Sequence, residues 1–375
     1  MPLPFSRQAL HFVATALMVA SASGQPVGDP PTTLRAAARG DLRIGTAVMA
    51  RHLDTPPHAT LIAEQFNALT AENEMKPGML QPRPGEFNFA AADRLVDFAA
   101  EHGMDVVGHT LIWHQQTPAW MFENAQGQPL PRDEALANMK HHIDTVMHHF
   151  KGRVRGWDVV NEAVADGPEI LRDTPARRAI GDDYILKAFE FAAAADPDAE
   201  LYYNDYNIEL DYKRERALTL VRQIRAAGLR IDAVGIQGHY QLHSPALTEI
   251  ERGLAAYADA GFDVMITELD VDPLPRRDAG GADLDAVEQS TGNPHPDRLP
   301  ADLQQQLAER YRTLFESMLA LPQIKRISFW GTHDGMSWLN DFPVRGRTNH
   351  PLLFDRQLQP KPAFDAVLQT LRKDQ

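Results

Sequence analysis

The feature that most restricts the possible folds is a regular alternation of short apolar segments with amphipathic segments of helical period. The apolar segments have the length and the Val, Ile and Trp content of buried strands, and they cover residues 42–49, 66–73, 104–113, 154–162, 199–207, 233–240, 263–271 and 326–334. Amphipathic segments such as 90–103, 214–228, 247–261 and 361–374 predict helices. Eight such units predict an α/β fold, a single-domain (β/α)8 TIM barrel, which typically takes about 250 residues plus insertions. The alternative, an open doubly wound sheet, usually carries a Gly-rich nucleotide-binding turn, which this sequence lacks.

Residues 1–23 have the three parts of a secretory signal peptide. Arg7 supplies the positive charge, residues 9–20 the apolar stretch, and residues 20–22 (Ala-Ser-Ala) the cleavage site. A membrane anchor is the alternative, but it needs about 20 apolar residues, and His11 interrupts this shorter stretch. We therefore expect export, to the periplasm or the medium. Residues 24–41 are expected to be a mobile leader, and residues 42–375 the barrel domain.

The composition restricts the partners and the chemistry. A formal net charge of -14 argues against a nucleic acid or a membrane surface as partner, because both require a basic face. The chain has no cysteine, which excludes disulfides, thiolate nucleophiles and cysteine-ligated metal sites.

Polar residues stand at the carboxyl end of nearly every predicted strand. In a barrel these ends meet on one face, where active sites lie. The residues are Glu72, Asn73, His109, Asn161, Glu162, Asn204, Gln237, His239, Glu268, Asp270 and Trp330. Any one of them could be a structural residue, but their repetition over seven strands predicts a functional site.

Two of these residues, Glu162 and Glu268, each end an apolar run, GWDVVNEAV and FDVMITELDV. Retaining glycosidases need one protonated and one ionised carboxyl group, about 5–5.5 Å apart. The alternative for either glutamate is a buried ion pair with Arg or Lys. Asp270 faces the same way as Glu268 and would raise its pKa unless His239 binds one of them. This reasoning favours Glu268 as nucleophile and Glu162 as acid/base.

The motifs TAENEMK, GHTLIWHQQTPAW, WDVVNEAV, YNDYN, GIQGHY, MITELDV and FWGTHDGMSW occur in this order over residues 42–370. Together they resemble family 10 of the glycoside hydrolases, the endo-β-1,4-xylanases. The resemblance implies hydrolysis of xylan and xylo-oligosaccharides with retention, without a cofactor or metal, and we expect a monomer. It assigns acid/base and nucleophile as above, with Asp270 supporting the nucleophile through His239. It assigns substrate binding to Glu72, Asn73, Lys76, His109, Trp113, Asn161, Gln237, His239, Trp330 and Trp338.

Two other functions stay open at this point, a retaining β-glucanase or cellulase of the same clan, and a catalytically silent carbohydrate-binding barrel. Several departures and alternatives are also visible. Pro77 follows Lys76 where many relatives carry Trp. An insertion at 272–300 follows the seventh strand and is expected to overhang the active face.

Metal binding is weakly indicated. His109 and His114 do not have the spacing of a zinc site, and the acidic residues of the insertion (Asp278, Asp283, Asp285 and Glu288) fit no calcium loop. Four histidines, His141, His142, His148 and His149, fall on a predicted outer helix and are expected to be solvated.

Overall fold

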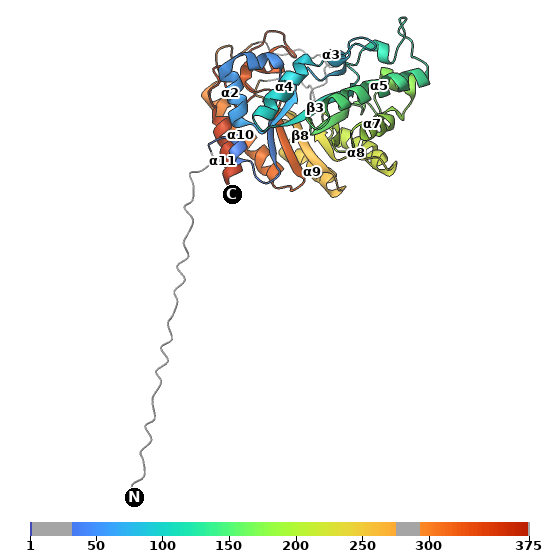
Figure 1. The fold of residues 1–375 in the computed structure, drawn as a ribbon. Coiled ribbons are helices and arrows are strands. Elements are labelled where there is room, and N and C mark those ends of the chain that lie inside the picture. Colours follow the sequence, from blue (N-terminus) through green and yellow to red (C-terminus); the bar gives the residue numbers. More distant parts are fainter. Residues whose placement is uncertain (2–31, 275–292, 374–375) are drawn as a thin grey trace. The chain divides into compact units, whose positions relative to one another are not determined.

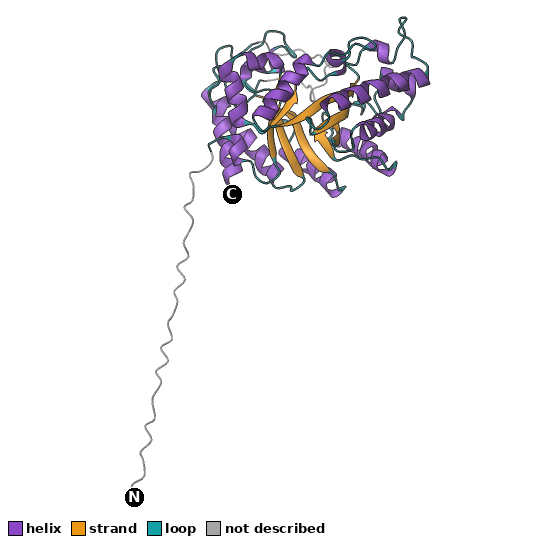
Figure 2. Cartoon of the chain, viewed as in Figure 1, coloured by secondary structure: helices purple, strands orange, loops and turns teal. Residues whose placement is uncertain are grey.

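Eight parallel strands close into a barrel in the computed structural model, which describes residue 1, residues 32–274 and residues 293–373. The barrel strands are β1 (Arg43–Val48), β2 (Ala68–Ala71), β3 (Asp105–Trp113), β4 (Gly156–Asn161), β5 (Glu200–Asp205), β6 (Ala233–Ile236), β8 (Asp263–Asp272) and β9 (Ile324–Phe329). Each is paired with its neighbour in parallel, and the β1–β9 and β6–β8 pairings complete the ring. Figure 2 shows the strands at the centre with helices around them. The predicted (β/α)8 barrel is confirmed.

The sixth predicted strand, 233–240, is divided in two by the structure. It consists of β6 and of β7 (His239–Gln241), which pairs only with the upper part of β8. Gly238 lies between them with φ +82°, a conformation that glycine adopts without steric cost and that ends a regular strand. The prediction of one continuous strand was therefore wrong at this glycine.

Helices follow the strands and cover the outside of the barrel (Figure 1). They are α2 (Pro56–Gln65), α3 (Pro77–Leu80), α4 (Ala90–Glu101), α5 (Arg132–Phe150), α6 (Pro175–Ile180), α7 (Tyr184–Ala195), α8 (Asp211–Ala226), α9 (Leu247–Asp259), α10 (Ala301–Leu319) and α11 (Pro362–Lys373). Four short 3-10 helices are η1 (Ala50–Asp54), η2 (Ala119–Met121), η3 (Asp334–Met336) and η4 (Trp338–Asn340). The main core contains side chains from both the strands and the helices, and a smaller buried cluster consists of Val107, Tyr202, Ala233 and Met265 from four barrel strands. Fully burying each large apolar side chain stabilises the fold by about 1.5–3 kcal/mol.

A first helix, α1 (Leu34–Ala37), lies inside the segment predicted as a mobile leader. Leu34 and Ala37 are buried in the main core, and the Leu34 amide donates a 3.2 Å hydrogen bond to Gln65 Oε1. This part of the leader is therefore packed against the barrel, because its two apolar side chains reach α2 and α11. The predicted signal peptide and residues 24–31 lie outside the described residues.

The insertion after β8 lies largely outside the described residues too. Its described parts are residues 272–274, of which the first ends β8, and residues 293–300, which lead into α10. The four acidic positions considered for calcium, Asp278, Asp283, Asp285 and Glu288, fall in the part that is not described. Among the helices that the structure does describe, none combines the length and the apolarity needed to cross a membrane.

Helix α5 carries the four histidines that were expected to be solvated, and for His142 this was wrong. His142 is 0% exposed, its Nδ1 donates to Gln81 Oε1 at 2.9 Å, and its ring stacks on Phe87. The reason is its place between Met139 and Val146 on the buried stripe of the helix. Burial lowers the pKa of His142 to about 3, so the ring is neutral at ordinary pH.

Candidate active site

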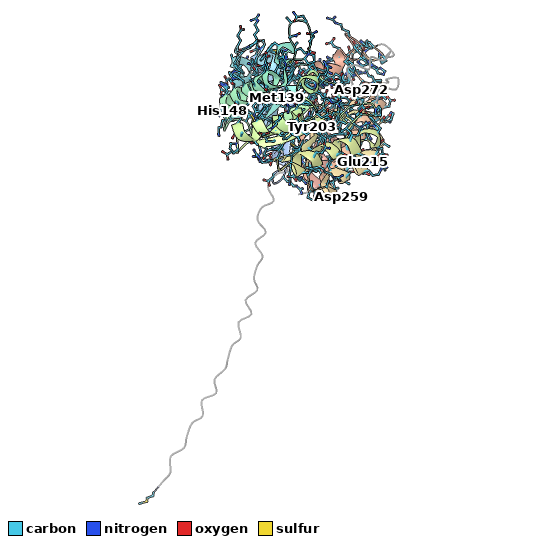
Figure 3. The ribbon with its side chains drawn as sticks, turned by 90° about the vertical axis from the view of Figure 1, so that its right-hand side faces the viewer. Met139, His148, Tyr203, Glu215, Asp259 and Asp272 are labelled. Carbon is cyan, nitrogen blue, oxygen red and sulfur yellow. The ribbon has the colours of Figure 1, made fainter. Side chains whose placement is uncertain are left out.

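The predicted site residues gather at the carboxyl ends of the strands, on one face of the barrel. Figure 3 gives the direction: Asp272, the last residue of β8, lies at the upper end, whereas Asp259, which ends the helix before β8, lies at the lower end. The side chains come from strands β3, β4, β7 and β8 and from the loops that follow β2, β4, β6 and β9. These are Glu72, Asn73, Lys76, His109, Trp113, Asn161, Glu162, Gln237, His239, Glu268, Asp270, Trp330 and Trp338.

Glu162 follows β4 directly and is 7% exposed. Its Oε1 accepts hydrogen bonds from Gln237 Nε2 at 2.8 Å and Asn161 Nδ2 at 3.3 Å, and its Oε2 accepts one from Trp113 Nε1 at 2.8 Å. Burial, followed by the negative charge of Asp205, raises the pKa of Glu162 to about 7, although the bonds from Gln237 and Trp113 oppose the shift. This carboxyl group therefore holds a proton close to neutral pH.

Glu268 lies in β8 and is 5% exposed, but its surroundings favour the charged form. Its Oε1 accepts from Asn204 Nδ2 at 2.9 Å, and its Oε2 lies 3.2 Å from His239 Nε2. Burial alone would raise the pKa of Glu268, but the hydrogen bond from His239 and the other donors outweigh it, so that the pKa lies below its ordinary value. Glu268 is therefore ionised where Glu162 is still protonated.

His239 connects the two carboxylates of β8. Its Nδ1 lies 3.1 Å from Asp270 Oδ1, and Trp338 Nε1 donates to the other Asp270 oxygen at 2.7 Å. Burial would lower the pKa of His239, but the charges of Asp270 and Glu268 raise it to about 10. The imidazolium thus compensates both carboxylates, whereas the sequence analysis required a contact of His239 with only one of them.

Asn204, at the end of β5, connects the two glutamates through its own amide group and that of Asn161. Its Nδ2 donates to Glu268 Oε1 and, also at 2.9 Å, to Asn161 Oδ1, while its Oδ1 accepts from Thr267. Asn161 in turn donates to Glu162. We named Asn204 only as a strand-end residue, and its position in the YNDYN motif was the one signal for this larger role.

A second group of polar side chains follows β2. Lys76 Nζ donates to Asn73 Oδ1 at 3.0 Å and lies 4.9 Å from the ring centre of Trp113. Glu72 is buried, and within the described residues its Oε2 has no hydrogen-bond partner. Burial raises the pKa of Glu72 to about 7, and burial likewise lowers the pKa of Lys76. A buried oxygen without a donor, beside a buried ammonium group, suits a ligand that is rich in hydroxyl groups.

Aromatic rings form the remaining wall of the site. Trp330 meets His109 edge to face at 5.4 Å and His239 at 6.4 Å, and Trp338 meets His239 at 5.0 Å. His109 is held by Asp158, whose Oδ2 accepts from His109 Nδ1 at 2.9 Å. Asp158 was not predicted as a site residue, although a lone aspartate in the apolar run GWDVV was a signal for it.

The described side chains that could bind a metal ion do not meet the requirements of a metal site. Over residues 32–274 and 293–373, no three His, Asp or Glu side chains come together as a metal site would require. His114 packs its ring against the edge of Trp113. The carboxyl groups of Glu162 and Glu268 and the imidazole of His239, described above, offer proton transfer and carboxylate chemistry.

Comparison with known sequences assigns the chain to a family. The sequence profile of Glycosyl hydrolase family 10 matches residues 33–370. The chain belongs to glycosyl hydrolase family 10. The match begins at residue 33, so the family 10 domain includes helix α1.

The family 10 assignment agrees with individual relatives over nearly their whole length. Endo-1,4-beta-xylanase B of Paenibacillus barcinonensis is 42% identical over 337 residues, which are 90% of this chain and 97% of that protein. The endo-1,4-beta-xylanase of Geobacillus stearothermophilus is 42% identical over 343 residues, 90% and 98% of the two chains. Among solved structures, a GH10 endoxylanase retrieved from a sugarcane soil metagenome superposes with a TM-score of 0.84 at 40% identity, covering 91% of this chain and 100% of that one.

Proposed function

We propose that Glu162 is the acid/base and Glu268 the nucleophile of this family 10 endo-1,4-β-xylanase, which hydrolyses internal β-1,4 bonds of xylan with retention. The observation that carries the assignment is the opposite perturbation of the two carboxyl groups. Glu162 has its pKa raised to about 7, whereas Glu268 has its pKa lowered by the donors around it. Pairs of carboxyl groups whose environments separate their pKa values are typical of an acid and a nucleophile.

The reaction then follows in two displacements. Glu268 attacks the anomeric carbon, the glycosidic C–O bond breaks, and the proton of Glu162 goes to the leaving oxygen. The ionised Glu162 next takes a proton from water, whose oxygen attacks the anomeric carbon and releases Glu268. Gln237 and Trp113, which donate to Glu162, stabilise its charged form between the two steps.

We assign substrate binding to the side chains around this pair. Asn161 is assigned to the 2-hydroxyl of the sugar whose bond is cleaved. His109, Trp113, Gln237 and His239 are assigned to surround the same sugar, with Asp270 orienting His239. Glu72, Asn73 and Lys76 are assigned to the next xylose on the non-reducing side, where the unpartnered oxygen of Glu72 would accept a hydroxyl hydrogen. Trp113, Trp330 and Trp338 supply aromatic faces. The two tryptophans after β9 crowd the space of a hydroxymethyl group, which is the physical basis for preferring xylose to glucose.

The assignment of the two glutamates is tested by azide rescue. In Glu268→Ala, azide should occupy the space of the nucleophile and give a glycosyl azide of inverted configuration. In Glu162→Ala, azide should attack the glycosyl-enzyme and give the retained configuration. Glu64→Ala, on the exposed side of α2, is the control and should keep parental turnover. The opposite pairing of configurations would exchange the two roles.

The substrate preference is tested by relative activity on xylan and on carboxymethyl-cellulose. A preference for the cellulosic substrate would favour the β-glucanase alternative, and an inert protein on an aryl xylobioside would favour the carbohydrate-binding barrel.

We also propose that the protein is exported and acts as a monomer. The pattern of residues 1–23 supports export, and N-terminal sequencing of the mature protein should find a start near residue 23. The monomer is proposed because the two glutamates and their hydrogen-bond partners already form a complete acid and nucleophile pair within this chain. Light scattering at the concentration of the activity assay should give the mass of one chain, and a larger mass would contradict the proposal.

A further inference from the structure

The backbone of Glu162 has an unusual conformation. Its φ is +58°, in the left-handed region, which residues with a side chain rarely adopt. This conformation costs roughly 1–2 kcal/mol for an L-residue other than glycine. Such a conformation persists only where the surrounding structure holds it in place. The question is therefore which groups hold the turn that carries Glu162.

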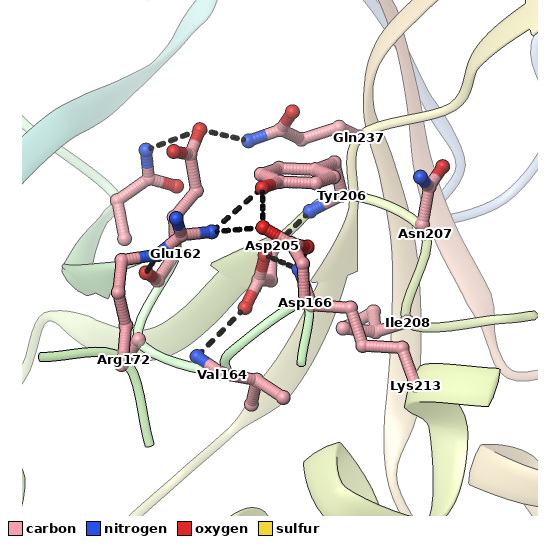
Figure 4. Close-up of polar contacts among 12 residues, drawn as sticks. Glu162, Val164, Asp166, Arg172, Asp205, Tyr206, Asn207, Ile208, Lys213 and Gln237 are labelled. Carbon is pink, nitrogen blue, oxygen red and sulfur yellow. Dashed lines mark hydrogen bonds and ion pairs between the residues drawn. The ribbon is translucent and has the colours of Figure 1, made fainter. Parts of the chain in front are cut away.

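The peptide groups of Glu162 itself are fixed on both sides. Its amide donates to the Asn204 carbonyl at 2.9 Å, and its own carbonyl accepts from Arg172 Nε at 3.3 Å. Arg172 also donates to Asp166 at 2.9 Å, which orients its guanidinium group (Figure 4). The first half of the turn is thus tied to β5 and to the loop that follows β4.

The next two amides are held by a tyrosine hydroxyl. Ala163 N and Val164 N donate to Tyr203 Oη at 3.0 and 3.1 Å. The same hydroxyl donates its hydrogen to Asp205 Oδ2 at 2.5 Å, and Val164 N also reaches that oxygen at 3.2 Å. Because its one hydrogen points at Asp205, the hydroxyl keeps its lone pairs toward the turn. Tyr203 is 0% exposed, so water does not replace it.

Asp205 is in turn fixed by a buried cation. Lys213 Nζ donates to Asp205 Oδ1 at 2.9 Å, and both side chains are 0% exposed. The same ammonium group reaches Asp166 at 3.2 Å, and the Tyr206 amide donates to Asp205 Oδ1 at 2.8 Å (Figure 4). A buried ion pair adds little net stability compared with apolar residues of the same size. Net stability alone therefore does not explain why the Lys213–Asp205 ion pair lies beside the acid/base.

We propose that Tyr203 and Asp205 are positioning residues for proton transfer: they hold the left-handed turn that points the Glu162 carboxyl group at the bond to be cleaved. This inference rests on the proposed function, in which Glu162 is the acid/base. Asp205 has a second effect, because its negative charge contributes to the raised pKa of Glu162, after burial.

The first test is Tyr203→Phe, which removes one hydroxyl group. The parent and the variant are compared on aryl xylobiosides with an activated dinitrophenol and with an unactivated phenol as leaving groups. Misplacing the acid should lower kcat/KM for the unactivated phenol by about ten- to a hundredfold, part of the 10²–10⁴ that a general acid contributes. For the activated substrate, kcat/KM should stay within about threefold, because that leaving group needs little protonation. There kcat and KM should fall together, because the intermediate accumulates when the base is misplaced.

Two further variants make the outcomes distinct. Tyr311→Phe removes another buried hydroxyl, which donates to the Pro351 carbonyl. This variant should keep the parental kcat/KM on both substrates. Glu162→Ala removes the acid itself and shows how strongly kcat/KM depends on the leaving group when no acid is present. If Glu162→Ala shows that dependence and Tyr203→Phe loses kcat/KM equally on both substrates, or not at all, the positioning role is overturned and the acid/base assignment stands. If Glu162→Ala itself shows no dependence, the proposed function falls and this inference with it.

A second test uses Asp205→Asn and the pH profile, and it serves if Tyr203→Phe fails to fold. Removing the charge of Asp205 makes ionisation of Glu162 easier, so the alkaline limb of kcat/KM should move to lower pH by about half a unit or more. The other groups that face Glu162 stay in place in this variant: the carboxylate of Glu268 from β8, the ammonium of Lys76, the guanidinium of Arg172, and the neutral donors Trp113 and Gln237. An alkaline limb at the parental pH would overturn the role of Asp205.

Discussion

Replacing His239 by leucine should move the acid limb of the pH profile to higher pH. The imidazolium of His239 donates to Glu268 and also compensates Asp270, two residues further along the same strand. Leucine fills a similar volume but has neither charge nor donor. Glu268 then loses the largest influence that lowers its pKa, while burial, which raises that pKa, remains. The carboxylate of Asp270, two residues further along the same strand, also loses its compensating charge, and a like charge nearby raises a carboxyl pKa. The nucleophile should therefore become protonated at a pH where the parent is still ionised.

The size of the shift follows from the contact that is lost. A hydrogen bond to a charged group contributes about 1.5–3 kcal/mol, and one pKa unit corresponds to about 1.36 kcal/mol. The acid limb of kcat/KM should therefore move up by about one to two pH units. Adding Asp270→Asn removes the like charge and should return the limb part of the way, since Asn204 still donates to Glu268.

The assay is the pH dependence of kcat/KM on an aryl xylobioside, with folding checked by circular dichroism at each pH. His142→Leu is the control, because it removes another buried imidazole whose contacts are with Gln81 and Phe87. Its acid limb should match that of the parent. An unchanged acid limb in His239→Leu, with the fold intact, would refute the account of how Glu268 is kept ionised.

Three further predictions concern stability. The pKa of His239 is raised from 6.5 to about 10 in the folded state, so the stabilisation that its charge provides is complete below pH 6.5 and is lost as the pH rises toward 10. The difference in unfolding free energy between the parent and His239→Leu should therefore shrink over that interval. A constant difference would contradict this prediction. In Gly253→Ala the new Cβ would lie 2.2 Å from the Glu209 carbonyl oxygen, so urea unfolding should show a loss of about 1–3 kcal/mol, whereas Gly167→Ala, with nothing within 4 Å, should be neutral. Lys213→Met leaves the buried carboxylate of Asp205 uncompensated and should cost about 3–5 kcal/mol; a loss below about 1 kcal/mol would show that this charge is compensated elsewhere.

The barrel and the list of site residues could be predicted because both depend on local patterns. Each strand can be predicted from its apolar run. In a barrel of parallel strands the carboxyl ends lie on one face, so Glu162 and Glu268 are expected on the same face. The opposing environments of the two glutamates could be predicted only in part. The contact of His239 with Glu268 or Asp270 could be expected from their places at strand ends, although His239 and Glu268 are 29 positions apart. The contacts of Glu162 with Trp113, which ends β3, and Gln237, which follows β6, were not predicted.

What the sequence could not provide are pairings between distant segments. Asp158 and Asn204 become site residues through contacts with side chains about 40–60 positions away, and no local pattern encodes such a contact. The burial of His142 was missed because a histidine on a helix is usually counted as a polar, solvent-facing residue. In the structure Gln81 accepts a hydrogen bond from His142, and this bond offsets the cost of burying the imidazole. The break at Gly238 was missed because a single glycine in an apolar run is compatible with a strand.

The break at Gly238 makes the position of His239 sensitive to the number of residues in this segment. Below it, Ala233 is aligned with Asp263, and above it His239 is aligned with Asp270, so the offset between the two segments grows by one residue. Without this slip His239 would stand opposite Leu269, whose side chain is buried in the outer core. Because side chains alternate between the two faces of a strand, a one-residue shift turns every one of them over. If the offset of β7 is kept, loss of the Gly238 codon would place the imidazole opposite Leu269 instead of Asp270 and so turn it away from the nucleophile, although both glutamates would be unchanged.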